Sequence, residues 1–166
     1  MTHTLILACG NSLRGDDGVG LHIARSLRVG EFGSDLEICE QQQWTAELTE
    51  PISRADLVIF VDAAAVGLKP GELRIEPIWL QNVSSAVTNM THTSTPAQLL
   101  ALAQLLYGKN PHRSFLLTIG GKSFEYSNEL SEPVCQAIPL ALDRIKGLIA
   151  GVSCPPVSPN WLAATS

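Results

Sequence analysis

The opening of the chain constrains its fold most strongly, because an apolar run, a glycine-rich loop and a helical pattern follow one another directly. Residues 5–9 are continuously apolar and end at Gly10, and hydrophobic residues recur at helical spacing between residues 19 and 27. A short apolar run closed by a turn is typical of a buried strand. The order strand, loop, helix predicts the first unit of an α/β fold.

The rest of the chain continues this alternation. Further strands are expected at about 36–39, 57–61, 72–78 and 114–119, and further helices at about 46–52, 97–107 and 131–149. This order predicts a three-layer α/β/α sandwich around a twisted, mainly parallel (mixed) sheet of about five strands. We expect one domain over residues 1–150 and a proline-containing, flexible tail over 151–166.

Composition excludes several classes of protein. Hydrophobic residues make up 45% of the 166 residues, which is enough for a packed core. The net charge is -5 and no basic cluster is present, so we expect no nucleic-acid partner. No apolar run reaches the roughly 18 residues of a spanning helix, and the start lacks the features of a signal peptide. The four cysteines form no Cys-x-x-Cys pair. We therefore expect a cytoplasmic protein with reduced thiols and no membrane contact.

Acidic residues follow two of the expected strands. Asp16 and Asp17 lie in the glycine-rich loop, Asp62 follows the third strand, and His92 lies in a polar loop before Pro96. Two carboxylates and an imidazole form a ligand set for a divalent transition metal, and the carboxyl ends of the strands are where ligands bind in open α/β sheets. The residues alone leave other roles open: a helix cap for Asp17, a turn cap for Asp62 and a surface position for His92.

Two other kinds of site are disfavoured. A Gly-x-Gly-x-x-Gly pattern begins at Gly18, but Ile23 occupies the position of its third glycine, and Asp16 and Asp17 would repel a pyrophosphate. The chain has no Walker loop and no Gly-x-Ser-x-Gly elbow. Cys9 lies within the apolar first strand, so we interpret it as a packing residue rather than a nucleophile.

Several motifs occur in an order that resembles one known family. They are Gly10-Asn11-Ser12-Leu13-Arg14-Gly15-Asp16-Asp17-Gly18-Val19-Gly20, then Val61-Asp62-Ala63, the turn Pro70-Gly71, and His92 ahead of Pro96-Ala97. Over about residues 4–150 the chain resembles the hydrogenase maturation proteases, endopeptidases that trim the large-subunit precursor of nickel-iron hydrogenases.

This resemblance implies roles for individual residues. Asp17, Asp62 and His92 would be both the metal ligands and the catalytic residues. Nickel would arrive with the precursor, and cadmium or zinc would replace it in vitro. Substrate contacts are expected at Gly10, Asn11, Asp16, Gln42 and Gln43. The stretch 40–48 departs from members that carry an Asp-Gly-Gly-Thr stretch after the second strand, which implies a different cognate precursor.

The implied activity is removal of the C-terminal extension of a nickel-loaded large-subunit precursor, after a His or Arg near the metal-binding cysteines. The implied partner is that precursor, and we expect a monomer. Two alternatives stay open. One is a metal-independent aspartic-type peptidase of the same architecture, with Asp17 and Asp62 as its dyad. The other is a non-enzymatic hydrogenase assembly factor.

Overall fold

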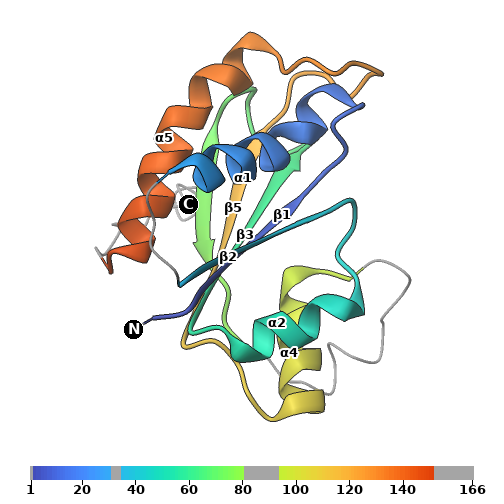
Figure 1. Ribbon diagram of the computed structural model, residues 1–166. Coiled ribbons are helices and arrows are strands. Elements are labelled where there is room, and N and C mark those ends of the chain that lie inside the picture. The colour runs from blue at the N-terminus through green and yellow to red at the C-terminus, as the bar shows by residue number, and fades with distance from the viewer. Residues whose placement is uncertain (1, 31–34, 81–93, 152–166) are drawn as a thin grey trace, which may run out of the picture.

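A five-stranded mixed sheet forms the centre of the computed structural model, which describes residues 2–30, 35–80 and 94–151 (Figure 1). The described strands are β1 (Thr4–Cys9), β2 (Leu36–Gln41), β3 (Leu57–Ala64), β4 (Leu73–Pro77) and β5 (Arg113–Gly120). Their order in the sheet is β2-β1-β3-β5-β4. Only β4 runs antiparallel, against β5. The predicted mainly parallel sheet is therefore confirmed.

Helices cover both faces of this sheet. The described helices are α1 (Val19–Val29), α2 (Thr49–Arg54), α4 (Pro96–Tyr107) and α5 (Glu132–Ile149), with short 3-10 turns η1 (Gly15–Gly18) and η2 (Ala46–Leu48). Helices α1 and α5 lie on one face, and α2 and α4 on the other (Figure 1). The predicted three-layer sandwich is confirmed, with element bounds that differ from the expected ones by a few residues.

Strand β3 shows how the sequence divides the core between the two faces. Side chains alternate along a strand, so every second residue points to the same face. Ile59 and Val61 belong to the core under α1 and α5, whereas Val58 and Phe60 belong to the core that includes residues of α2 and α4. The same alternation places Asp62 on the face of Phe60.

The start of α4 is well defined by local hydrogen bonds. Thr95 caps the helix by accepting a bond from the backbone N–H of Gln98 (3.2 Å), and the Gln98 side chain accepts one from Thr95 N (2.8 Å). Pro96 occupies the first turn, and Gly108 ends the helix with a left-handed φ of 64°. These residues confirm the predicted start and stop signals.

Some expectations fall on residues that the structure does not describe. His92 lies outside the described residues, and so does the expected tail from residue 152 onward. Within the described ranges, no helix combines the length and the hydropathy that crossing a bilayer would require.

Candidate functional site

The glycine-rich loop after β1 holds Asp17 in a defined position. Gly10 has a φ of 147°, and a Cβ at this position would collide with the backbone carbonyl of Asp17. The backbone N–H of Asn11 donates a 2.9 Å hydrogen bond to Asp17 Oδ2. The N-cap residue of α1 is Gly18, and α1 has no side-chain cap. The helix-cap role that the sequence left open for Asp17 is therefore wrong.

Gly20 lets α1 approach the ends of two neighbouring strands. A Cβ at this position would lie 2.8 Å from the carbonyl oxygen of Cys9 on β1 and 3.0 Å from that of Val61 on β3. Both distances are shorter than ordinary van der Waals contacts, so only glycine fits here. The first turn of α1 consequently rests on the carboxyl ends of β1 and β3, where Asp17 and Asp62 come together.

Asp62 lies on β3 in a partly buried position. The pKa of Asp62 is raised to about 6; burial of the carboxyl group is the largest cause, and the negative charge of Asp17 also contributes. Hydrogen bonds from the backbone N–H of Ala63 (2.8 Å to Oδ1) and from the Trp44 side chain lower this pKa and offset part of the rise. The two carboxylates therefore repel each other, which favours uptake of a proton or a cation between them.

Trp44 links Asp62 to the segment that enters α4. Its indole is buried and packs edge-on against Phe60, with ring centroids 5.4 Å apart. Its side chain hydrogen-bonds to Asp62, while its backbone carbonyl accepts a 3.0 Å hydrogen bond from the N–H of Ser94. Trp44 was not among the residues predicted from the sequence, although an aromatic residue within the polar stretch 40–45 was a signal.

Cys9 lies next to the two carboxylates but is not a nucleophile. Its side chain is buried in the core, and Sγ donates to the carbonyl oxygen of Gln42 at 3.4 Å. Burial raises the pKa of the thiol to about 12, with added contributions from the charges of Asp62 and Asp17. The thiol therefore stays protonated at neutral pH, which agrees with the packing role predicted for it.

Asp16 occupies a different environment from Asp17. Its side chain is completely buried. Oδ2 accepts hydrogen bonds from Lys122 N (2.7 Å), Ser123 N (3.0 Å) and Ser131 Oγ (2.8 Å), and Oδ1 accepts one from Ser131 N (2.7 Å). Burial opposes ionisation, but these hydrogen bonds outweigh it and hold the pKa of Asp16 below its usual value. We call this arrangement the Asp16 clasp. It leaves no exposed carboxylate for the substrate contact that we expected at Asp16.

Three of the other expected substrate contacts line one small cavity. Gly10, Asn11 and Gln42 border a cavity of about 280 Å³ between the glycine-rich loop and the end of β2. Gln43 is exposed next to Gln42. Contact between these residues and a substrate stays a prediction.

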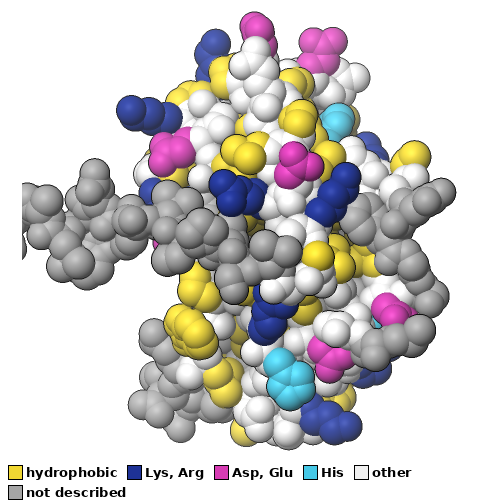
Figure 2. Space-filling view, turned by 90° about the vertical axis from the view of Figure 1, so that its left-hand side faces the viewer, with side chains coloured by type: hydrophobic (Ala, Val, Ile, Leu, Met, Phe, Trp, Pro, Cys, Tyr) yellow, Lys and Arg dark blue, Asp and Glu magenta, His cyan; other side chains and the backbone are white. Residues whose placement is uncertain are grey.

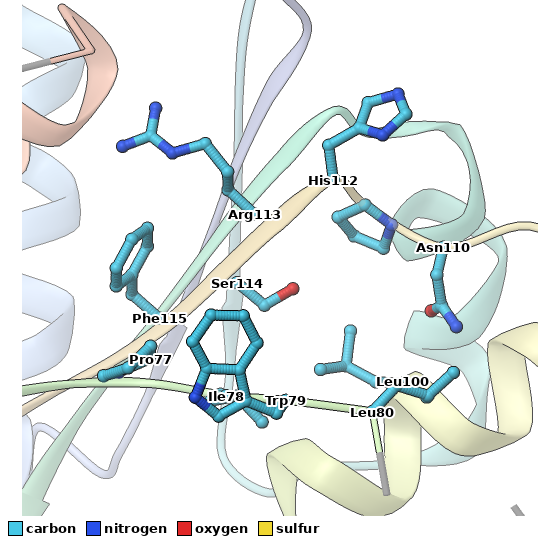
Figure 3. Close-up of a pocket in the computed structure, with 11 residues that line it drawn as sticks. Pro77, Ile78, Trp79, Leu80, Leu100, Asn110, His112, Arg113, Ser114 and Phe115 are labelled. Atoms are coloured by element: carbon cyan, nitrogen blue, oxygen red, sulfur yellow. The ribbon is translucent and has the colours of Figure 1, made fainter.

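An apolar pocket of about 480 Å³ lies at the other end of the sheet (Figure 3). It is bordered by Trp79 and by Arg113, the first residue of β5. Arg113 pairs with Leu57, whereas Asp62 pairs with Thr118, five residues further along the strand. At about 3.3 Å per residue, roughly 16 Å separates the two levels. This pocket is therefore distinct from the carboxylate pair.

The described residues supply two of the three expected metal ligands. Within residues 2–30, 35–80 and 94–151, no group of three or more His, Cys, Asp and Glu side chains is arranged to hold a metal ion. The structure brings Asp17 and Asp62 together, close enough for their charges to interact. The third expected ligand, His92, precedes the anchored Ser94 by two positions in the sequence.

Comparison with known proteins agrees with this architecture. Two relatives match by sequence: the hydrogenase expression/formation protein HupD of Thiocapsa roseopersicina, 27% identical over 150 residues, and a putative hydrogenase maturation protease of Methanocaldococcus jannaschii, 28% identical over 152 residues. These matches cover 85% and 87% of this chain. They span just under two thirds (66%) of the Thiocapsa protein and 95% of the Methanocaldococcus protein.

Solved structures share the fold. The Escherichia coli hydrogenase maturating endopeptidase HybD has a TM-score of 0.70 at 25% identity, and the match covers 90% of this chain and 93% of HybD. The [NiFe] hydrogenase maturation protease HycI of Thermococcus kodakarensis has a TM-score of 0.68 at 24% identity, with 90% and 93% covered. The family model described as hydrogenase maturation protease matches residues 36–147, more than half of the sequence. The chain therefore belongs to the hydrogenase maturation protease family.

Proposed function

We propose that this protein is an endopeptidase that removes the C-terminal extension of a nickel-loaded [NiFe]-hydrogenase large-subunit precursor, cleaving after a His or Arg near the metal-binding cysteines. The observation that carries this proposal is the interacting pair Asp17 and Asp62 at the carboxyl ends of β1 and β3. Family membership supports it, since the E. coli neighbour HybD is described as a hydrogenase maturating endopeptidase.

The proposed site binds the nickel that the precursor brings, through Asp17, Asp62 and His92. The donor chemistry supports this set, because a divalent cation between the two carboxylates would offset the burial of Asp62 and relieve its repulsion by Asp17, the two causes that raise its pKa. Carboxylate oxygens and an imidazole nitrogen are suitable ligands for nickel, and cadmium or zinc would replace it in vitro. His92 is included because of its place in the sequence, two residues before the Ser94 that is anchored to Trp44.

The chain's own residues account for the proton transfer and the positioning. If the reaction runs without a metal, Asp62 would instead be the general base that accepts a proton from the attacking water, since a carboxyl group with a pKa of about 6 is better matched to neutral pH than an ordinary one. With a cation bound to both carboxylates this pKa would fall, and Asp62 would act as a ligand. Asp17 is held by Asn11 N–H and provides the second carboxylate. When bound, the metal would polarise the scissile carbonyl.

The proposed setting is a cytoplasmic monomer that docks transiently on its precursor, without nucleic-acid or membrane partners. The net charge of -5 supports the absence of a nucleic-acid partner. On the face shown in Figure 2, Lys and Arg side chains are spread among acidic and hydrophobic ones instead of forming one basic patch.

A cleavage assay with purified precursor tests this function. The nickel-loaded precursor and its metal-free form are incubated with the wild type and with the variants Asp17→Asn, Asp62→Asn and His92→Ala, and products are identified by mass spectrometry. We expect the wild type to cleave only the loaded precursor and the three variants to lose at least about a thousandfold in kcat/KM, as expected when a catalytic group is removed. Asp143→Asn, which changes an exposed carboxylate on α5, is the matched control and should cleave like the wild type.

Other outcomes of this assay favour the alternatives. Cleavage that continues after chelation and does not require His92 would favour a metal-independent dyad of Asp17 and Asp62. Stable complex formation without any cleavage, with or without nickel, would favour an assembly factor.

A further inference from the structure

Three exposed apolar side chains occupy the loops at the end of the sheet that carries Asp17 and Asp62. We propose that Leu13, Val66 and Tyr126 form a docking surface for the folded body of the protein substrate, and that the Asp16 clasp keeps this surface in register with the candidate site. This inference rests on the proposed function. It identifies the surface that binds the folded body of the precursor, as distinct from the site that binds the segment to be cleaved.

All three side chains are exposed to solvent. Relative exposure is 86% for Tyr126, 85% for Val66 and 50% for Leu13. They belong to the loops that follow β5, β3 and β1, which leave the sheet at the same end (Figure 1). Single exposed hydrophobic residues are common on protein surfaces. Here, however, one such residue comes from each of the three loops around the carboxylate pair.

Hydrogen bonds between these loops fix their relative positions. The N–H of Ser127, next to Tyr126, donates to the carbonyl of Leu13 (3.0 Å), and the N–H of Gly15 donates to the carbonyl of Ser127 (2.7 Å). The N–H of Gly121 donates to the carbonyl of Ala64 (2.9 Å), which joins the loop after β5 to the end of β3. These backbone contacts hold the three loops together at one end of the sheet.

The Asp16 clasp connects this surface to the chemistry. Its carboxylate binds backbone N–H groups at Lys122, Ser123 and Ser131, on both sides of Tyr126 in the sequence. Asp17 is the next residue after Asp16, and its backbone N–H is bonded to the carbonyl of Arg14 (3.2 Å). A shift of the Tyr126 loop would therefore act on the peptide unit that positions Asp17.

The chemistry of the surface fits a folded protein partner. Exposed polar residues flank Tyr126 in the same loop, namely Lys122, Glu125, Asn128 and Glu129. Apolar and aromatic anchors within a polar rim are characteristic of protein interfaces, where tyrosine is enriched among the residues that contribute most to affinity.

Steady-state kinetics on the nickel-loaded precursor tests this surface. We expect Tyr126→Ala to raise KM at least about fivefold and to leave kcat within about twofold, because the ring contributes to binding alone. Tyr126→Phe, which keeps the ring, should have nearly wild-type KM. Tyr107→Ala is the matched control: Tyr107 is also exposed (45%), but it lies near Ala55 and Asp56, at the opposite end of the sheet.

Three results would overturn the inference while the proposed function still held. The first is an unchanged KM for the double variant Leu13→Ser/Tyr126→Ala. The second is a fall in kcat without a rise in KM for Tyr126→Ala, and the third is a rise in KM for the control Tyr107→Ala as large as that for Tyr126→Ala. If the wild type does not cleave at all, the proposed function fails separately. The surface is then tested by equilibrium binding of the same variants to the nickel-loaded precursor. A loss of affinity of at least about fivefold for Tyr126→Ala would support it, and equal affinity for the double variant and the wild type would reject it.

Discussion

The side chain of Trp44 hydrogen-bonds to the carboxylate of Asp62 and lowers its pKa, which opposes the larger effect of burial. The same tryptophan accepts a hydrogen bond from Ser94, at the entrance to α4. Trp44 thus connects one carboxylate of the pair to the segment of the chain that contains the third proposed ligand. The carboxylate pair is therefore linked to the segment that enters α4.

Trp44→Phe should separate the hydrogen bond from the packing. Phenylalanine keeps an aromatic ring against Phe60 but has no N–H to donate to Asp62. We expect kcat for precursor cleavage to fall about tenfold, the value of one lost hydrogen bond to a charged group. The free energy of unfolding should fall by about 1–2 kcal/mol because the smaller ring leaves space. Denaturant unfolding and single-turnover cleavage measure the two effects, and a wild-type kcat would show that this hydrogen bond has no role in the reaction.

Asp16→Asn should destabilise the protein at neutral pH. If the side-chain NH2 group of the new asparagine takes the place of Oδ2, its hydrogens face the backbone N–H groups of Lys122 and Ser123. These two buried donors then have no acceptor. We expect a loss of at least about 2 kcal/mol in the free energy of unfolding. Urea unfolding at pH 7 measures this loss. Asp17→Asn is the control and should cost much less, because its carboxylate lies in a partly exposed loop with a bond to Asn11. Equal losses for both variants would contradict the clasp.

Asp62→Asn should change stability in the opposite direction and in a pH-dependent way. The pKa of Asp62 is raised to about 6 in the folded protein, above the value of about 3.9 for an unfolded chain. Its ionisation therefore opposes folding above pH 6, and this cost disappears as the pH falls from about 6 to about 4. We expect Asp62→Asn to be more stable than the wild type at pH 7.5, with the advantage shrinking toward pH 4. Thermal unfolding across this range checks the trend, and an advantage that grows on acidification would exclude a raised pKa.

The architecture could be predicted from the sequence, because each strand and helix is indicated by a pattern within its own short segment of the chain. The apolar run before Gly10 and the helical spacing after Gly18 each predict one element, and Pro96 and Gly108 mark the ends of α4. Both faces of the sheet are covered, so the alternation of strands and helices leads to a three-layer arrangement.

The separate roles of Asp16 and Asp17 could not be predicted in the same way. The partners of Asp16 lie 106 to 115 residues further along the chain, and no local pattern indicates them. Asp17 differs because its hydrogen bond comes from Asn11, within the same loop. The contact between Trp44 and Asp62 likewise depends on how β2, its following loop and β3 pack together. The ligand role of His92 stays a prediction, since it lies outside the described residues.

The most direct test of the central claim is to locate a bound metal by anomalous scattering in crystals of the protein soaked with cadmium or nickel. This measurement assumes nothing about the ligands. We predict a single strong anomalous peak that marks a metal ion bound by Asp17, Asp62 and His92. The peak should be absent from crystals of Asp62→Asn. A peak elsewhere, or an ordered His92 side chain too far from the two carboxylates to share one ion with them, would contradict the proposed metal-dependent site.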